Sequence, residues 1–232
     1  MMNKFIAIVL LISLSGISFS TRAAEKILLT GIETISDSSS YVYLGTVIPL
    51  PGNTLAHGLA VHLWADFLKY AYDSGATEIN AKANSVSAAI AYHDSGSNYW
   101  WNAKIGITQN DTQLTPDDLT NQSRGKQSAL KLQLGGEYRF SSAIKMTGIA
   151  DYVPDREAYW TRLRLLGKID GQKYHGPEII FQGDPSYDAQ QLGWVITGIA
   201  VQEHSLMGAK AGVRKGGDST SGYIGVELLT FY

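Results

Sequence analysis

The chain has 232 residues, with 19 lysines and arginines against 21 aspartates and glutamates and a formal net charge of −2. A net charge so near zero argues against nucleic acid as a partner, and the absence of cysteine excludes disulfides, thiolate metal sites and cysteine nucleophiles. Glycine occurs 24 times and tyrosine 13 times, which favours a sheet protein with many turns, and the length suits one domain of substantial size.

The start of the chain has the pattern of a secretory signal peptide. Lys4 stands in a short basic start, an apolar run follows from Phe5 to Ile12, and Thr21 and Ala23 supply the small residues of a cleavage site. The run is too short, and too often broken by serine, to span a bilayer as a helix, which takes about 20 apolar residues. We therefore expect a signal peptide over residues 1–23 and one β-barrel domain over residues 24–232.

The first four strands of the mature chain are predicted from alternation and turn residues. Ile27–Ile35 and Tyr41–Leu50 flank a serine-rich turn and indicate a hairpin. Leu59–Tyr70 and Ile79–His93 follow, each with apolar residues at every second position and polar residues between them. A period of two is typical of a strand, because a helix would not sort residues onto two faces in this way.

The middle of the chain continues the pattern with Tyr99–Thr108, then a long polar connection over Gln109–Lys126, then Leu130–Arg139 and Ile144–Tyr152. The strand Leu130–Arg139 has the clearest alternation of all. Its leucines and tyrosine occupy one face and its charged residues the other, as expected of a strand between a polar and an apolar environment.

The last part of the sequence predicts five more strands on either side of a connection over Lys168–His175. They are Tyr159–Leu165, Glu178–Gly183, Gln191–Gln202, Ser205–Arg214 and Gly222–Tyr232. The total is about twelve, and ten remains open if the first hairpin is irregular. An even number brings both ends of a barrel to one side of a membrane. The long connection then lies on the outer side, as expected, whereas Lys168–His175 is a mild exception on the inner side.

The closing segment decides between a membrane barrel and a soluble one. Gly222–Tyr232 alternates and ends on an aromatic residue, which is typical of the last strand of a bacterial outer-membrane barrel. Soluble barrels and sandwiches also alternate, but they bury the apolar face. A closed barrel is the sheet that satisfies its backbone hydrogen bonds in a bilayer. We therefore expect an all-β, antiparallel, up-and-down transmembrane β-barrel in the bacterial outer membrane, with its apolar face against outer-membrane lipid.

The polar face of these strands supplies the candidate lumen residues. The candidates are His62, Trp64, Asp66, Trp100, Lys104, Lys131, Glu137, Arg139, Lys145, Asp151, Arg162, Arg164, Glu178, Lys210, Arg214 and Glu227. Isolated charges at low dielectric are costly, so most of these charges must be paired or hydrated. A salt-bridged, largely occluded interior is one interpretation. The other is a narrow polar passage in which Trp64, Trp100 and Trp160 offer stacking surfaces for sugars.

Three patterns of residues suggest a catalytic or metal-binding role, and each also has a solvated or structural interpretation. His93 and Ser95 have a spacing that resembles the catalytic His-x-Ser of outer-membrane lipid hydrolases, although Ser95 falls in an expected turn. His62 and Asp66 share a face but lie about 13 Å apart at the rise of a strand, too far to share one metal ion. Acidic residues between Gln109 and Lys126 lack the spacing of a strong calcium loop; they are Asp111, Asp117 and Asp118. No catalytic residue, metal site or cofactor is predicted.

Several short motifs resemble the cellulose biosynthesis protein BcsS family. They are Tyr41-Val42-Tyr43-Leu44-Gly45, Pro49-Leu50-Pro51-Gly52 and Tyr174-His175-Gly176-Pro177-Glu178, continued by Gln191-Leu192-Gly193, Gly198 and Tyr223. Their order carries the resemblance, which covers most of the mature chain. It implies an outer-membrane barrel without catalytic residues that assists synthesis or secretion of cellulose or a related exopolysaccharide. The expected partners are then a glucan or components of cellulose synthesis. A lipid hydrolase using His93 and Ser95, and a small diffusion channel, remain alternatives.

Overall fold

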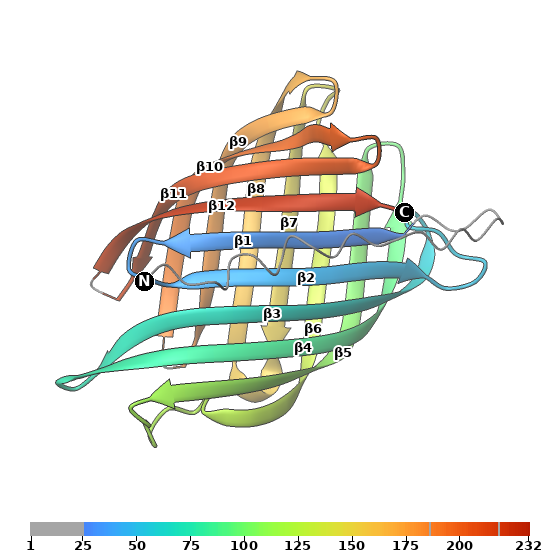
Figure 1. Cartoon of the computed structure of the whole chain (residues 1–232). Helices are drawn as coiled ribbons and strands as arrows, with labels where there is room; N and C mark the ends of the chain where they lie inside the picture. Colours follow the sequence, from blue (N-terminus) through green and yellow to red (C-terminus); the bar gives the residue numbers. More distant parts are fainter. Residues whose placement is uncertain (1–25, 186, 218) are drawn as a thin grey trace.

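The computed structural model describes residues 26–185, 187–217 and 219–232, so the predicted signal peptide lies outside the described residues. Twelve strands close into one antiparallel barrel, in which each strand pairs with its neighbours in sequence and β12 pairs with β1 (Figure 1). The register of the closing pair runs from Ile27 opposite Phe231 to Ile35 opposite Tyr223. The predicted fold class and the larger of the two predicted strand numbers are confirmed.

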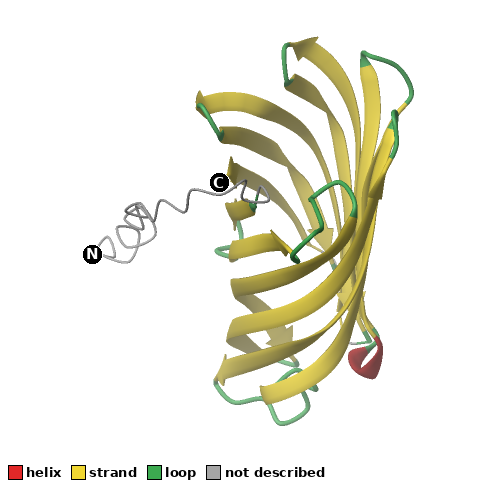
Figure 2. Ribbon diagram, turned by 90° about the vertical axis from the view of Figure 1, so that its right-hand side faces the viewer, coloured by secondary structure: helices red, strands yellow, loops and turns green. Residues whose placement is uncertain are grey.

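The elements follow one another with short connections. Their bounds are β1 (Ile27–Ile35), β2 (Ser40–Pro49), β3 (Gly58–Ser74), β4 (Thr77–Ser95), β5 (Tyr99–Thr115), β6 (Gly125–Arg139), β7 (Ile144–Val153), the 3-10 helix η1 (Pro154–Arg156), β8 (Ala158–Asp170), β9 (Lys173–Asp184), β10 (Tyr187–Gln202), β11 (Ser205–Gly216) and β12 (Ser219–Phe231). Strands dominate the described chain in every view (Figure 2). In that part of the chain, no helix is long and apolar enough to cross a membrane.

Two of the expected connections are shorter in the structure. Strand β5 continues to Thr115 and pairs with β6 as far as Thr112 opposite Gly125, so the loop over Gln109–Lys126 shrinks to residues 116–124. Likewise β8 and β9 pair until Asp170 opposite Lys173, which removes the expected exception at Lys168–His175. Both predicted loops were too long for the same reason. The ends of these strands are mostly polar on both faces, so the apolar alternation stops there although the backbone hydrogen bonds between the strands continue.

The two ends of the barrel differ. At one end, which we call the terminal end, lie Lys26, Tyr232 and the turn over residues 50–57. At the other, the loop end, lie the turns after β1 and β3, the loop 116–124 and η1. Strands β3, β4 and β5 have 17, 19 and 17 residues, which exceeds the roughly 9–11 residues of a tilted membrane strand. One side of the wall therefore extends beyond the length needed to cross a bilayer.

The outer wall is apolar. Ile107, Leu134 and Ile224 are 68%, 62% and 64% exposed, and they belong to the outward parity of their strands. Exposed large apolar side chains occur on nearly every strand. Together they form far more exposed apolar surface than a monomer in water normally has. The wall is therefore of the kind that contacts lipid.

Candidate functional site

The guanidinium group of Arg164 joins strands of the barrel that are not neighbours. Arg164 on β8 donates from Nη1 and Nη2 to the carboxylate of Glu227 on β12, at 2.7 and 3.1 Å. Its Nε donates to Glu178 on β9 at 2.6 Å, and Arg162 Nη1 lies 3.5 Å from Glu227. Strands β8 and β12 are not neighbours in the sheet, so the contact crosses the lumen and does not follow the wall.

The network continues toward β1. Lys210 on β11 lies 2.6 Å from a carboxylate oxygen of Glu33 and 3.6 Å from one of Glu178. Gln191 donates to Glu33 at 3.0 Å, and the Tyr223 hydroxyl donates to Glu178 at 3.5 Å. We call this set the Arg164 cluster: Glu33, Arg162, Arg164, Glu178, Gln191, Lys210, Tyr223 and Glu227. Its three cations and three carboxylates balance, which is how charges survive burial.

A second set of charges lies on the opposite side of the interior. Asp66 on β3 bonds to Ser85 and interacts with Lys131 on β6. Lys131 pairs with Asp151 at 3.4 Å, and Lys104 interacts electrostatically with both. Gln133 also donates to Asp151. Strands β3 and β6 are not adjacent, so the electrostatic interaction of Asp66 with Lys131 acts between separate parts of the wall.

A directional chain of hydrogen bonds links this interior to the terminal end. The Lys104 ammonium lies 3.3 Å from His62 Nδ1, His62 Nε2 lies 2.9 Å from His93 Nε2, and His93 Nδ1 lies 2.9 Å from the Leu55 carbonyl. Because Lys104 can only donate, His62 must accept at Nδ1 and donate from Nε2, and His93 must then donate to Leu55. Trp100 donates to the same carbonyl at 3.3 Å. The chain thus ties the turn over residues 50–57 to the interior.

The three tryptophans proposed as sugar platforms are already engaged. Trp64 stacks on Tyr43, with ring centroids 4.9 Å apart and an angle of 12° between the rings. Trp100 meets the ring of His93 at 5.7 Å, and the guanidinium of Arg162 lies 5.6 Å from the ring of Trp160. Trp64 also covers Gly45 so closely that a Cβ there would lie 2.0 Å from the indole. Each of the three indoles therefore already has an aromatic or cationic neighbour within the barrel.

The remaining candidates lie toward the two ends. Near the terminal end, Glu137 binds both Lys145 and Arg139, each at 2.8 Å. At the loop end, Arg214 pairs with Asp37 at 3.2 Å and donates to the hydroxyl of Tyr187. Each of the sixteen predicted residues thus has a defined partner, and most of the partners share the inward parity of their strands.

Loop 116–124 is fixed at the mouth of the barrel. The Tyr72 hydroxyl donates to Asp118 at 3.0 Å, and Asn121 donates to Tyr72 at 2.8 Å. The hydroxyl and the backbone N–H of Thr120 donate to Asp118, and these bonds hold the pKa of that carboxyl below its ordinary value. Asp117 and Arg124 form a bidentate pair at 2.6 and 2.7 Å, and the hydrogen bond from Arg124 lowers the pKa of Asp117.

The His-x-Ser pattern is not assembled as a catalytic pair. Both ring nitrogens of His93 bind other groups, namely His62 and Leu55, and the residue is only 1% exposed. Ser95 is the last residue of β4 and lies outside the turn in which it was expected. Within the described residues, no group of three or more His, Cys, Asp or Glu side chains is arranged to hold a metal ion.

Two acidic residues that pair with interior cations were not predicted from the sequence. The predicted set held eight basic and only five acidic residues, and the structure adds two carboxylates to it, those of Glu33 and Asp37. Glu33 shares the face of Gly31 and Ile35, so its parity was a usable signal. Asp37 lies in a turn, where no periodicity exists to reveal its direction.

Comparisons with known proteins agree with the fold. A family model described as cellulose biosynthesis protein BcsS matches residues 27–231, and a search of curated proteins finds no match. An outer membrane channel from Pseudomonas putida F1 is similar, with a TM-score of 0.57, 12% identity and coverage of 94% of this chain and 100% of that chain.

Two further solved structures are similar. The transport unit of the autotransporter AIDA-I from Escherichia coli has a TM-score of 0.54, 8% identity and coverage of 95% and 94% of the two chains. The KdgM porin in complex with disordered oligogalacturonate has a TM-score of 0.50, 10% identity and coverage of 87% and 97%. At these identities the likeness shows the fold alone, which is that of outer-membrane β-barrels.

Proposed function

The chain belongs to the cellulose biosynthesis protein BcsS family, and on that premise we propose that it is a non-enzymatic outer-membrane barrel that assists synthesis or secretion of cellulose or a related exopolysaccharide. Its partners are then outer-membrane lipid, the glucan, and components of cellulose synthesis or secretion. The proposal needs no cofactor.

The observation that carries the accessory role is the cross-lumen contact of Arg164 with Glu227, at 2.7 and 3.1 Å. Side chains that join β8 to β12 narrow the interior, and we propose that they leave it too narrow for a polymer chain. A barrel of twelve strands lies between the eight that side chains nearly fill and the sixteen or more that leave an aqueous channel. An occluded barrel acts through its ends and its wall, and so assists export without being its conduit.

Export to the outer membrane is supported by three independent features. They are the signal pattern over residues 1–23, the apolar outer wall, and the barrel fold shared with solved outer-membrane proteins. A wall with Ile107 68% and Ile224 64% exposed would aggregate in water.

The experiment that tests this function is a deletion of the gene followed by complementation. We expect the deletion to reduce cell-surface cellulose or to alter its organisation in the biofilm matrix, and the wild-type gene to restore it. Complementation with Ser95→Ala separates the accessory role from a hydrolase, because an accessory barrel keeps its function without that hydroxyl. Unchanged cellulose and an unchanged matrix in the deletion strain would count against the proposal.

A diffusion channel is the second candidate, and one observation favours it. Charged side chains line the interior, and solved barrels of similar fold are described as a porin and an outer membrane channel. The cross-lumen pairs oppose it. Conductance in planar bilayers discriminates between an occluded accessory barrel and a diffusion channel.

A further inference from the structure

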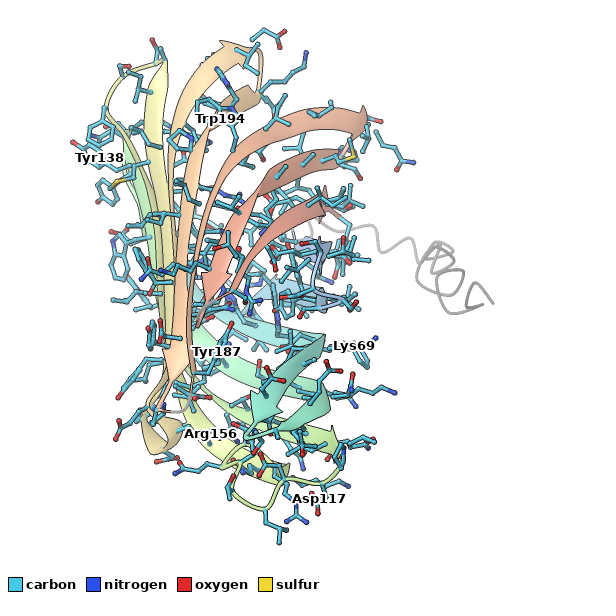
Figure 3. The ribbon with its side chains drawn as sticks, turned by 90° about the vertical axis from the view of Figure 1, so that its left-hand side faces the viewer. Lys69, Asp117, Tyr138, Arg156, Tyr187 and Trp194 are labelled. Carbon is cyan, nitrogen blue, oxygen red and sulfur yellow. The ribbon has the colours of Figure 1, made fainter. Side chains whose placement is uncertain are left out.

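Tyrosines of two strands that are not neighbours, β3 and β10, lie at the loop end of the barrel. Tyr70 and Tyr72 on β3 stack with ring centroids 6.1 Å apart and an angle of 26°. Tyr187 is the first residue of β10, so it lies at the same end of the barrel as Tyr70 and Tyr72 near the end of β3. Tyr187 is 39% exposed and lies on the inner side of the wall (Figure 3). Strands β3 and β10 are not neighbours, so these rings line the mouth.

Polar groups hold Tyr187 in place and leave hydrogen-bonding capacity beside it. The guanidinium of Arg214 lies 5.7 Å from the centroid of the Tyr187 ring, and Gln182 donates to the hydroxyl of Tyr187 at 3.4 Å. Among the described residues, Arg214 Nε and Gln191 Oε1 have no hydrogen-bond partner. Gln191 is only 4% exposed and lies directly opposite Arg214 in the register of β10 and β11. One atom is a donor and the other an acceptor, which is the complement of a hydroxyl group.

The charges around this cluster do not favour an anion. The cation of Arg214 is balanced by Asp37 at 3.2 Å, and Asp184 interacts with Tyr70 from the same mouth. Gln191 also donates to Glu33, which pairs with Lys210, so the charged groups named here are three carboxylates and two cations. An acidic sugar would meet net negative charge, whereas a neutral sugar with many hydroxyls would meet aromatic rings and fixed polar groups, the usual composition of a ligand site.

We propose that this cluster, which we call the tyrosine mouth (Tyr70, Tyr72, Tyr187, Gln191 and Arg214), binds a neutral glucan chain. A sugar ring stacks on the exposed face of Tyr187, and its hydroxyls bond to Arg214 and Gln191. The inference rests on the proposed function for the choice of a glucan. It places the binding site at the loop end of the barrel, next to the Arg164 cluster, with which it shares Gln191.

Calorimetric titration of the purified barrel in lipid nanodiscs with cellohexaose tests the proposal. We expect cellohexaose to bind and oligogalacturonate to bind at least tenfold more weakly. Tyr187→Ala should reduce the affinity for cellohexaose at least tenfold, and Tyr187→Phe, which keeps the ring, should reduce it less. Tyr138→Ala is the matched control, because Tyr138 is 43% exposed on the outer side of the wall (Figure 3).

Heat-modifiable mobility on gels confirms that each variant is folded, and Gln191→Leu replaces Tyr187→Ala if the latter does not fold. Absence of cellohexaose binding, equal binding by Tyr187→Ala, or tighter binding of oligogalacturonate overturns the tyrosine mouth. These outcomes are separate from the deletion experiment. If the deletion strain has a cellulose defect but the purified barrel does not bind cellohexaose, only the tyrosine mouth is rejected. If the purified barrel binds cellohexaose but the deletion strain makes normal cellulose, only the cellular role is rejected.

Discussion

Arg164 and Glu227 join two strands that lie apart in the sheet, through two hydrogen bonds of 2.7 and 3.1 Å across the interior. The side chain of Arg164 is 6% exposed and that of Glu227 is 20% exposed, so little water screens the pair. On the proposal that the lumen is occluded, we expect this contact to stabilise the barrel and to limit conduction through it.

Glu227→Gln should destabilise the barrel. The variant keeps the shape of the side chain but removes the carboxylate that pairs with both Arg162 and Arg164, while Arg164 keeps its pair with Glu178. Breaking a buried ion pair costs about 3–5 kcal/mol because one charge remains uncompensated. Urea unfolding in lipid vesicles, followed by tryptophan fluorescence, measures the loss. Asp117→Asn is the control, since its pair with Arg124 is exposed and should contribute no measurable stability.

The wild-type barrel should be almost silent in planar bilayers, and the balanced double variant Arg164→Ala/Glu227→Ala should conduct. Removing both side chains takes out a crossing of the lumen without adding net charge. Single-channel recording at moderate salt checks the prediction. The double variant Asp117→Ala/Arg124→Ala removes an equally balanced pair from the loop and should stay silent. Large conductance in the wild type would favour the diffusion channel.

Loop 116–124 should loosen at low pH. The pKa of Asp118 is lowered in the folded state by the hydrogen bonds from Thr120, so the bound carboxylate stabilises the loop above the unfolded value of about 3.9. That contribution is lost as the pH falls through the folded pKa. Hydrogen exchange of the loop amides, corrected for intrinsic rates, should show protection at pH 6 that declines near pH 2. Asp118→Asn should be less protected at pH 6 and should respond less to pH.

His93→Ala should release the turn over residues 50–57 while lipid turnover is unchanged. The substitution removes the donor to the Leu55 carbonyl and breaks the chain from Lys104. Faster hydrogen exchange confined to the turn is the expected result, with Trp100 still holding the carbonyl in part. Ser95→Ala should leave both the turn and the lipid composition unaltered. Altered membrane lipid in Ser95→Ala would revive the hydrolase and contradict the assignment of His93 to a structural chain.

Much of the fold was readable because strand periodicity is local. Ile27–Ile35 was predicted with the bounds that the structure shows, and strand β12 was recognised from its alternation and its terminal aromatic residue. The extensions of β5 and β6 were missed, because outside the apolar band both faces are polar and the alternation disappears.

The sequence by itself determined an antiparallel barrel of about twelve strands, the apolar face of most strands, and a resemblance to the family whose model matches residues 27–231. Only the tertiary structure decided which charges meet, because partners such as Arg164 with Glu227, or Lys210 with Glu33, depend on the tilt, the stagger and the circumference of the closed sheet. A period of two states which side of a strand a residue occupies. The residue that faces it across the lumen is set by the closure of the whole barrel.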